Sequence, residues 1–328
     1  MMENSNTELS KIQFAASRYI KEIGRGKAGA RSLSRQDAQL LYAAMLAGEV
    51  SDLEMGGILL AMRIKGESVD EVAGFLDASK PFVMRMACSP AARYAPIVIP
   101  SYNGARKKPN LTPLLAILLA RAGAPVLVHG VRQDAGRVTT AEIFLALGQS
   151  FALDAEQAQQ QMTQGQAAFV PIDKLAPAMQ RILAMRRILG VRNSTHTLVK
   201  LLQPFDVPAL RLCAYTHPEY HSMLDDYFCQ LAPHKEGAAF LMRGTEGEVV
   251  ASTGRAQQID HYAMGQGETL LETEAQLLGQ EIDLPESADA DTTAAWIQAV
   301  LAGEKSVPAN IARQVELCLA YSKALRAG

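Results

Sequence analysis

Apolar residues recur with helical spacing along the first part of the chain, and serines that can cap helices divide the pattern. Ser34 with Asp37, and Ser68 with Glu71, have the spacing of a capping box, and Lys65-Gly66 interrupts the pattern between them. These signals predict helices over residues 11–22, from Arg35 to about Ala47, from Ser51 through Ile64, and after Ser68. Residues 1–87 are therefore expected to form an all-helical domain.

Short, strongly apolar runs replace this pattern after residue 87. Such runs predict strands, and the helical patterns between them are typical of a parallel α/β sheet. The expected strands are Ile97–Ile99, Val126–Val128, Leu210–Tyr215 and Ala238–Met242. Helices are expected over 172–189, and twice in the tail beyond Thr292. The predicted organisation is a helical domain of residues 1–87, onto which 165–192 folds back, and an α/β domain of residues 88–164 and 193–328 with a mostly parallel central sheet.

Composition places the chain among ordinary globular proteins. Its 328 residues are 48% hydrophobic and 20% charged. No apolar run approaches the roughly 18 residues of a membrane span, and Met1–Ser10 lacks the apolar core of a signal peptide. The four cysteines form no C-x-x-C pair. We expect a cytoplasmic protein with no membrane partner.

Charge is distributed unevenly, although the formal net charge is only −2. Residues 243–304 contain twelve acids and two arginines, a local charge of −10, so the rest of the chain carries +8. Lys174–Lys200 contains six cations and no acid, and Lys11–Arg35 contains seven cations and one acid, Glu22. A nearly neutral sum therefore conceals basic surfaces of the kind that bind polyanions.

The segment Pro100–Pro109 lies between a predicted strand and a predicted helix. Many α/β proteins bind phosphate at such a place, through backbone N–H groups and the helix dipole. The segment has a single glycine, Gly104, and three consecutive cations, Arg106, Lys107 and Lys108. This composition favours a site for phosphate charge over a tight cradle for pyrophosphate, and a solvated basic turn is the alternative.

Several motifs, in this order along the chain, resemble the anthranilate phosphoribosyltransferase family, which shares its fold with thymidine phosphorylase. The resemblance covers roughly residues 30–320 and is carried by Leu33–Asp37, Ala47–Ser51, Ala61–Glu67, Val128–Arg132, Ala141–Gly148 and Leu189–Arg192. Segments 97–119 and 190–202, and the tetrad Gly244–Gly247, resemble the YbiB-like branch most closely. The resemblance implies a cleft between a small helical domain and a larger α/β domain, a homodimer through the helical domain and, for that branch, nucleic-acid binding.

The sequence departs from the enzymes of that family where they bind phosphate and metal. Their G-T-G-G-D is replaced by Ser101–Arg106, and their small-residue anion loop becomes Val138–Glu142. The adjacent acid pair that would hold Mg²⁺ aligns with Val249-Val250, and valine offers no oxygen ligand. Glu246 and Glu248 lie close by and remain alternative ligands. We expect no metal, no cofactor and no catalytic residue.

Cations that the family cleft retains or gains form the predicted binding site. The predicted nucleic-acid or phosphate ligands are Arg106, Lys107, Lys108, Asn110, Arg132, Arg186, Arg187, Arg192 and Lys200. Residues expected to line the cleft are Tyr102, Asn103, Gly104, His129, Gly130 and His196. Structural roles remain open for some of them, because Arg186 and Arg187 could form a solvated helix face and His129 could pack in the core. Tyr102 is a lone aromatic that could stack on a base.

The predicted function is that of a homodimeric, non-catalytic relative of these enzymes, which binds DNA or RNA with little sequence preference through a basic cleft or groove. The alternative is a glycosyl- or phosphoribosyltransferase with an unidentified acceptor and a rearranged Mg²⁺ site, using Asn110, His129 and Arg186. A regulator that binds a small phosphorylated metabolite is a third hypothesis. His217 and His221 have metal-ligand spacing, but without an evident third ligand they are interpreted as surface histidines.

Overall fold

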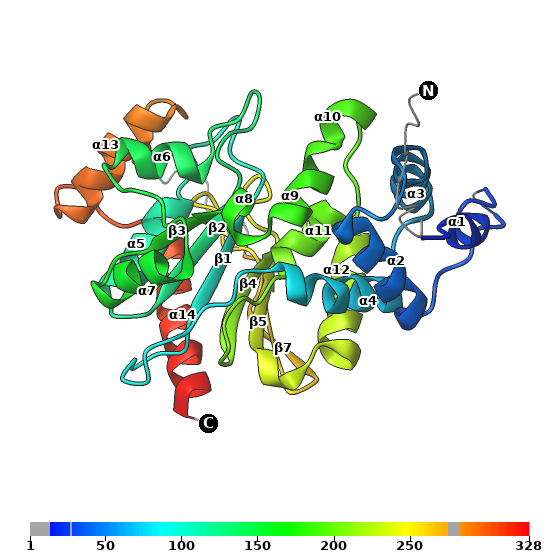
Figure 1. Cartoon of the computed structure of the whole chain (residues 1–328). Helices are drawn as coiled ribbons and strands as arrows, with labels where there is room; N and C mark the ends of the chain where they lie inside the picture. The colour runs from blue at the N-terminus through cyan, green and yellow to red at the C-terminus, as the bar shows by residue number, and fades with distance from the viewer. Residues whose placement is uncertain (1–13, 27, 275–282, 328) are drawn as a thin grey trace, which may run out of the picture.

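The first part of the fold is a helical domain, seen at one end of the molecule in Figure 1. The computed structural model describes residues 14–26, 28–274 and 283–327. The helical domain contains α1 (Ser17–Ile23), α2 (Arg35–Ala47), α3 (Asp52–Lys65) and α4 (Val69–Ser79), followed by the 3-10 turn η1 (Lys80–Phe82). Ser51 and Ser68 form complete capping boxes with Glu54 and Glu71. The predicted helices over 35–47 and 51–64 are confirmed to within one residue, whereas positions 11–13 of the helix predicted over 11–22 lie outside the described residues.

Seven strands form one sheet in the order β3-β2-β1-β4-β5-β6-β7. They are β1 (Ile97–Ser101), β2 (Val126–Gly130), β3 (Ala168–Pro171), β4 (Ala209–Ala214), β5 (Gly237–Met242), β6 (Ile259–Ala263) and β7 (Gln266–Leu271). Strands β1 to β5 pair in parallel, and β6 and β7 add an antiparallel edge. The four predicted strands are confirmed. The other three escaped prediction because β3 is short and ends in proline, and β6 and β7 carry polar, partly exposed residues.

Helices cover both faces of the sheet, and alternate strand residues divide between two cores. Ile97 and Ile99 face the core formed with α5 (Thr112–Arg121), α6 (Thr140–Ala146), α13 (Ala290–Leu301) and α14 (Ala309–Ala327). Val98 and Leu127 face the core shared with the helical domain. The remaining elements are α7 (Ala155–Thr163), α8 (Ile172–Leu175), α9 (Pro177–Ala184), α10 (Arg186–Leu189), α11 (Thr195–Leu198), η2 (Val199–Leu201), α12 (Pro218–Asp226), the π-turn η3 (Tyr227–Leu231) and η4 (His234–Glu236). Figure 1 shows α9 to α12 between the sheet and the helical domain.

Segments from the middle of the chain contact the helical domain. The Arg181 guanidinium of α9 donates to the carbonyl oxygens of Met45 and Leu46 in the last turn of α2. The buried Tyr42 hydroxyl lies 2.8 Å from the Thr195 hydroxyl at the start of α11. Residues of α9 and α11 are therefore in direct contact with α2.

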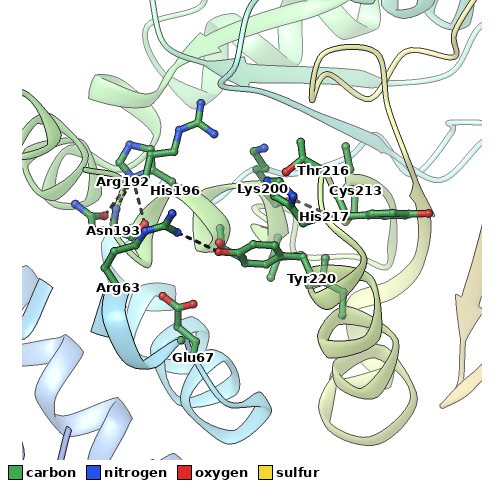
Figure 2. A pocket seen from close by; sticks show the side chains of 16 residues that line it. Arg63, Glu67, Arg192, Asn193, His196, Lys200, Cys213, Thr216, His217 and Tyr220 are labelled. Atoms are coloured by element: carbon green, nitrogen blue, oxygen red, sulfur yellow. Dashed lines mark hydrogen bonds between the residues drawn. The ribbon is translucent and has the colours of Figure 1, made fainter. Parts of the chain in front are cut away.

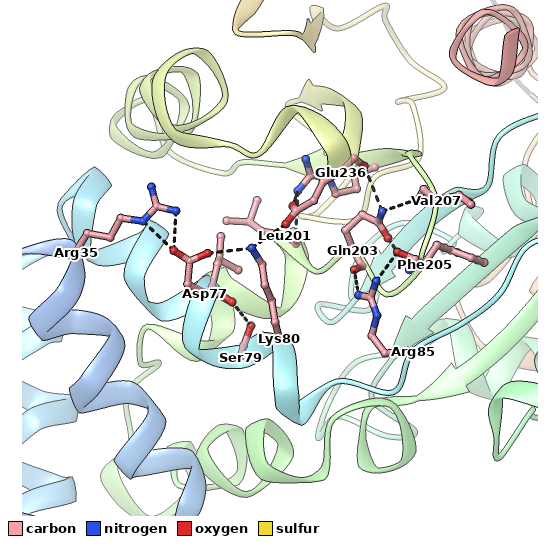
Figure 3. Close-up of polar contacts among 12 residues, drawn as sticks. Arg35, Asp77, Ser79, Lys80, Arg85, Leu201, Gln203, Phe205, Val207 and Glu236 are labelled. Atoms are coloured by element: carbon pink, nitrogen blue, oxygen red, sulfur yellow. Dashed lines mark hydrogen bonds and ion pairs between the residues drawn. The ribbon is translucent and has the colours of Figure 1, made fainter. Parts of the chain in front are cut away.

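A chain of ion pairs also joins the two parts of the molecule (Figure 3). Asp77 of α4 pairs with Arg35 and Lys80, and Lys80 lies 3.1 Å from Glu236. Glu236 in turn pairs at 3.1 Å with Arg211 of β4, whose side chain is 2% exposed. Because a buried guanidinium needs a partner, this chain ties the end of α4 to the middle of the sheet.

Candidate functional site

A large cavity lies beyond the carboxyl ends of β1 and β2, the edge at which open α/β sheets commonly bind ligands. Its volume is about 500 Å³, and its lining includes Tyr102 after β1, Arg132 after β2, and Arg186 and Arg187 of α10. His196 of α11 completes the far wall. This space, called the outer cavity below, therefore brings together five of the predicted site residues.

Two of the three arginines in the outer cavity have acidic partners. Arg132 makes a bidentate ion pair with Asp173, at 2.9 and 3.1 Å. Arg186 lies 3.4 Å from Asp134, whereas the exposed Arg187 pairs with no acid in the described part of the chain. The absence of acids from residues 174–200 therefore did not leave Arg186 unpaired, because Asp134 reaches it from the loop after β2. The cavity is less positive than the sequence predicted.

The loop after β1 binds two carboxylates of the same chain through its backbone N–H groups. Glu248 Oε1 accepts from Asn103 N at 2.8 Å and from Gly104 N at 2.7 Å. Glu246 accepts from Arg106 N at 2.5 Å and from Lys107 N at 3.1 Å. The N–H groups that could hold an anion at this loop are thus occupied by internal acids.

The turn that carries these two acids has an unusual backbone. Glu246 has a φ of 52°, in the left-handed region that glutamate rarely adopts. Gly247 has a φ of 90°, and a Cβ added there would lie 1.8 Å from Asn103 Nδ2. The turn therefore requires glycine at 247, and its strained conformation presents both carboxylates to the loop.

The predicted ligands in this loop fall into two groups. The side chains of Arg106, Lys107 and Lys108 are exposed, but they line neither of the two cavities described here. Asn110 is buried: its amide oxygen accepts from Thr112 N at 3.1 Å and so supports the start of α5. Asn110 was predicted to bind phosphate, whereas in the structure its side chain supports the backbone at the start of α5.

Several residues predicted to line the cleft are buried instead. His129 has no exposed surface, and its Nδ1 lies 2.6 Å from the Tyr102 hydroxyl. Burial lowers the pKa of His129 to about 3, so the imidazole is neutral. A Cβ at Gly130 would lie 1.8 Å from the Ser101 carbonyl oxygen, so this glycine permits close approach of two strands. Neither His129 nor Gly130 lines the outer cavity, and Tyr102, at 7% exposed, offers no open ring face for stacking.

Asn103 and Gly104 are also internal. Both residues are buried, and the Asn103 side chain accepts a hydrogen bond of 3.2 Å from Arg192. Their contribution to the site is to position the loop and Arg192. These two residues, predicted to line the cleft, do not line the outer cavity, and their backbone N–H groups donate to Glu248.

A second, smaller cavity contains the remaining predicted cations (Figure 2). Its volume is about 150 Å³, and Arg192 and Lys200 line it together with Arg63 of α3. His196 borders both this space, called the inner pocket below, and the outer cavity. Arg63 had not been predicted as a site residue, because a cation in the last turn of a helix is an ordinary helix-ending signal.

Burial and mutual repulsion depress the pKa values of the groups around the inner pocket. Burial lowers the pKa of Lys200 to about 8, with Glu248 opposing the change and Arg192 adding to it. Burial, followed by the Arg192 charge, lowers the pKa of His196 to about 3. The pKa of Arg192 is lowered by burial and by the charges of Arg186 and Arg137. Arg137, which donates to the Gly104 carbonyl oxygen at 3.3 Å, is a second cation missed from the sequence.

The residues present do not fit the Mg²⁺ that the related enzymes hold. Val249 and Val250 are each 1% exposed and pack in the core. Glu246 and Glu248 accept hydrogen bonds from the loop after β1, so they are not free as an adjacent pair of oxygen ligands. No group of three His, Cys, Asp or Glu side chains suited to a metal occurs among the described residues.

The two histidines with metal-ligand spacing have different environments. His217 is exposed just before α12, as predicted. His221 is only partly exposed, and its Nε2 lies 3.0 Å from Asp260 Oδ2 of β6. The interpretation as surface histidines therefore holds for His217 alone. In the part of the chain that the structure describes, no helix has the length and apolar character needed to cross a membrane.

Comparison with known proteins supports the same fold. The chain is 46% identical over 303 residues to the protein YbiB of Escherichia coli (strain K12), covering 92% of each. It is 27% identical over 299 residues to anthranilate phosphoribosyltransferase of Methylobacterium nodulans, covering 90% of this chain and 85% of that protein. The crystal structure of anthranilate phosphoribosyltransferase from Thermus thermophilus matches with a TM-score of 0.68 at 21% identity, over 95% of this chain and 89% of that one.

Family models match both parts of the chain. The helical bundle domain of the glycosyl transferase family matches residues 17–80, and the a/b domain of that family matches residues 103–323. The predicted fold, a helical domain followed by a larger α/β domain with a mostly parallel sheet, is confirmed, as is the resemblance to anthranilate phosphoribosyltransferase and YbiB. The chain belongs to the glycosyl transferase family.

Proposed function

We propose that this protein binds nucleic acid with little sequence preference and does not transfer phosphoribosyl groups. The observation that carries the proposal is the exchange at the family's phosphate site. Internal carboxylates occupy the loop N–H groups, valines replace the metal-binding acids, and exposed cations surround the region. Such an exchange suits a polymer whose phosphates are neutralised one at a time by side chains.

Two basic surfaces are the proposed contacts. The first is the loop of Arg106, Lys107 and Lys108, whose side chains extend into solvent close to the start of α5. The second is the rim of the outer cavity, where Arg187 is exposed beside Arg186 on α10. Both lie beyond the carboxyl ends of the parallel strands or next to them, so one strand of nucleic acid could contact the two in turn.

The arginines of α10 provide a direct test of this function. Arg186→Ala with Arg187→Ala should weaken the binding of a labelled oligonucleotide about tenfold at low salt, since each phosphate contact contributes through charge. Lys323→Ala, an exposed cation on α14, is the matched control and should leave affinity unchanged. Equal affinity of the double variant and the parent, with folding intact, would remove α10 from the interface.

A transferase remains the alternative, because relatives of this chain are named anthranilate phosphoribosyltransferase. We expect no anthranilate-dependent release of pyrophosphate in the presence of Mg²⁺. Without a metal ligand pair the charge of the leaving pyrophosphate loses a stabiliser that contributes several kcal/mol. Turnover at an ordinary enzymatic rate, of the order of 1 s⁻¹ or more, would favour the transferase.

We also propose that the protein forms a homodimer through its helical domain. Leu53 and Ile64 of α3 are 88% and 60% exposed, and Leu60 on the same helix is 46% exposed. A groove between α1 and α3 is lined mainly by apolar residues, including Ile20, Ile23 and Leu60. A second copy of this chain is the proposed occupant, and the dimer that the family resemblance implies supports this choice.

A further inference from the structure

The inner pocket lies where the helical domain meets the α/β domain (Figure 2). Arg63 comes from α3, Arg192 from the turn before α11, Lys200 from η2, and Tyr220 from α12. The Arg63 guanidinium and the Tyr220 hydroxyl approach each other across it at 3.5 Å. Any ligand in this space would therefore touch both domains.

The cations of the inner pocket have few partners. Lys200 makes no ion pair or side-chain hydrogen bond with any described residue, and Arg192 has a single neutral partner, the amide oxygen of Asn103. Arg63 has only the long contact to Tyr220 among the described side chains. One carboxylate, Glu67, also lines the pocket, and the charge of Glu248 acts on Lys200. These two acids do not balance the three cations, so the pocket retains a positive charge that an anion could neutralise.

We propose that the inner pocket binds a small phosphate monoester, at a site separate from the surface that binds nucleic acid. Its three cations come from three different segments, so they can approach a tetrahedral anion from different directions. A planar carboxylate would instead be matched by one guanidinium acting through two parallel hydrogen bonds. The remainder of the ligand would lie against Leu201, Leu224 and the Tyr220 ring.

The size of the pocket limits the ligand. A cavity of about 150 Å³ holds on the order of five water molecules, each of which takes about 30 Å³ in the liquid. This space is too small for a segment of nucleic acid but sufficient for a phosphate group with a few carbon atoms. A bound phosphate would neutralise cations from both domains, so its binding should also raise the unfolding temperature of the protein.

Inorganic phosphate and phenyl phosphate are suitable probes, measured by calorimetry on the full-length protein at constant ionic strength. Saturable binding by the parent is expected. Lys200→Met and Arg63→Gln should each raise the Kd for both probes about tenfold or more, as expected for loss of a charge-assisted hydrogen bond. Arg187→Gln, which removes an exposed cation of the outer cavity, is the control and should change the Kd less than about twofold.

Three results would contradict the proposed phosphate site. The first is an absence of saturable phosphate binding by the parent, and the second is a loss of affinity in Arg187→Gln equal to that in Lys200→Met and Arg63→Gln. The third is binding of benzoate as tight as that of phenyl phosphate. If Lys200→Met does not fold, Arg63→Gln decides alone, since the Arg63 side chain is exposed. Oligonucleotide affinity, measured on the same variants, tests the nucleic-acid function separately, so either proposal can fail without the other.

Discussion

The Glu246 side chain binds the backbone of the basic loop that contains Arg106, Lys107 and Lys108. Its carboxylate accepts hydrogen bonds from the N–H groups of Arg106 and Lys107, where a phosphate of a bound strand would otherwise be attracted. Glu246→Ala frees these donors, while Glu246→Gln removes the charge but keeps an acceptor oxygen. We expect the alanine variant to bind oligonucleotides about threefold to tenfold more tightly than the parent at low salt, and the glutamine variant to show a smaller gain.

Fluorescence anisotropy with a labelled oligonucleotide measures both gains. Glu304→Gln, an exposed acid after α13, controls for the change in net charge. An equal gain in all three variants would mean that Glu246 acts only through overall charge. No gain in either Glu246 variant would mean that the loop N–H groups do not compete for phosphate.

Lys200 makes stability depend on pH in an unusual direction. Its pKa is lowered from 10.5 to about 8 in the folded protein, chiefly by burial. Below pH 8 the folded chain carries a poorly solvated ammonium, and between pH 8 and 10.5 the unfolded chain binds more protons, so stability rises with pH across this window. Lys200→Met should therefore be more stable than the parent at pH 7, on the order of 1 kcal/mol after allowance for solvent screening.

Urea unfolding of the parent and the Lys200→Met variant tests this linkage. The stability difference should shrink steadily as the pH rises from 8 toward 10.5. A difference that stays constant across the window would show that the methionine acts through packing and not through the lost ammonium.

Local sequence signals predicted the helices and the central strands, whereas contacts between residues far apart in the chain were not predicted. The helices after Ser34, Ser51 and Ser68 are determined by capping bonds within three residues, so their starts are visible in the sequence. The antiparallel edge of β6 and β7 gave no apolar run to detect.

The candidate site shows the same division between local and distant contacts. Most of the cations were predicted, with Arg63 and Arg137 as exceptions, but their partners were not. Asp134 lies 52 positions from Arg186, and Glu246 lies 140 positions from Arg106. Such pairings depend on how the chain folds back on itself, so the spacing of residues along the sequence does not predict them.

We predict that the protein dimerises through helix α3, because a cluster of exposed leucine and isoleucine side chains is unusual on a monomer surface. The parent should sediment at twice 35.4 kDa at micromolar concentration. Leu60→Glu with Ile64→Glu should shift it to the monomer mass, whereas Leu153→Glu, at another partly exposed leucine, should not. A parent that sediments at 35.4 kDa alone would contradict the proposed dimer.

The molecule has a fold shared with anthranilate phosphoribosyltransferase. The helical domain and the a/b domain match the models of the glycosyl transferase family. At the loop after β1, internal carboxylates accept hydrogen bonds from the backbone, Val249 and Val250 are buried, and Arg106, Lys107 and Lys108 are exposed. Our proposal is consistent with these features: nucleic acid would bind to this protein through side-chain charge.

The salt dependence of oligonucleotide affinity is the decisive test of binding through side-chain charge. If six phosphates are contacted, the logarithm of the association constant should fall with the logarithm of salt concentration with a slope of about −4 on single strands and about −5 on B-DNA. Lys107→Glu with Lys108→Glu should weaken binding to all sequences and flatten the single-strand slope by about 1.4 if both lysines contact phosphate, while Lys323→Glu leaves it unchanged. A slope near zero, or no binding by the parent even at low salt, would rule out binding through side-chain charge.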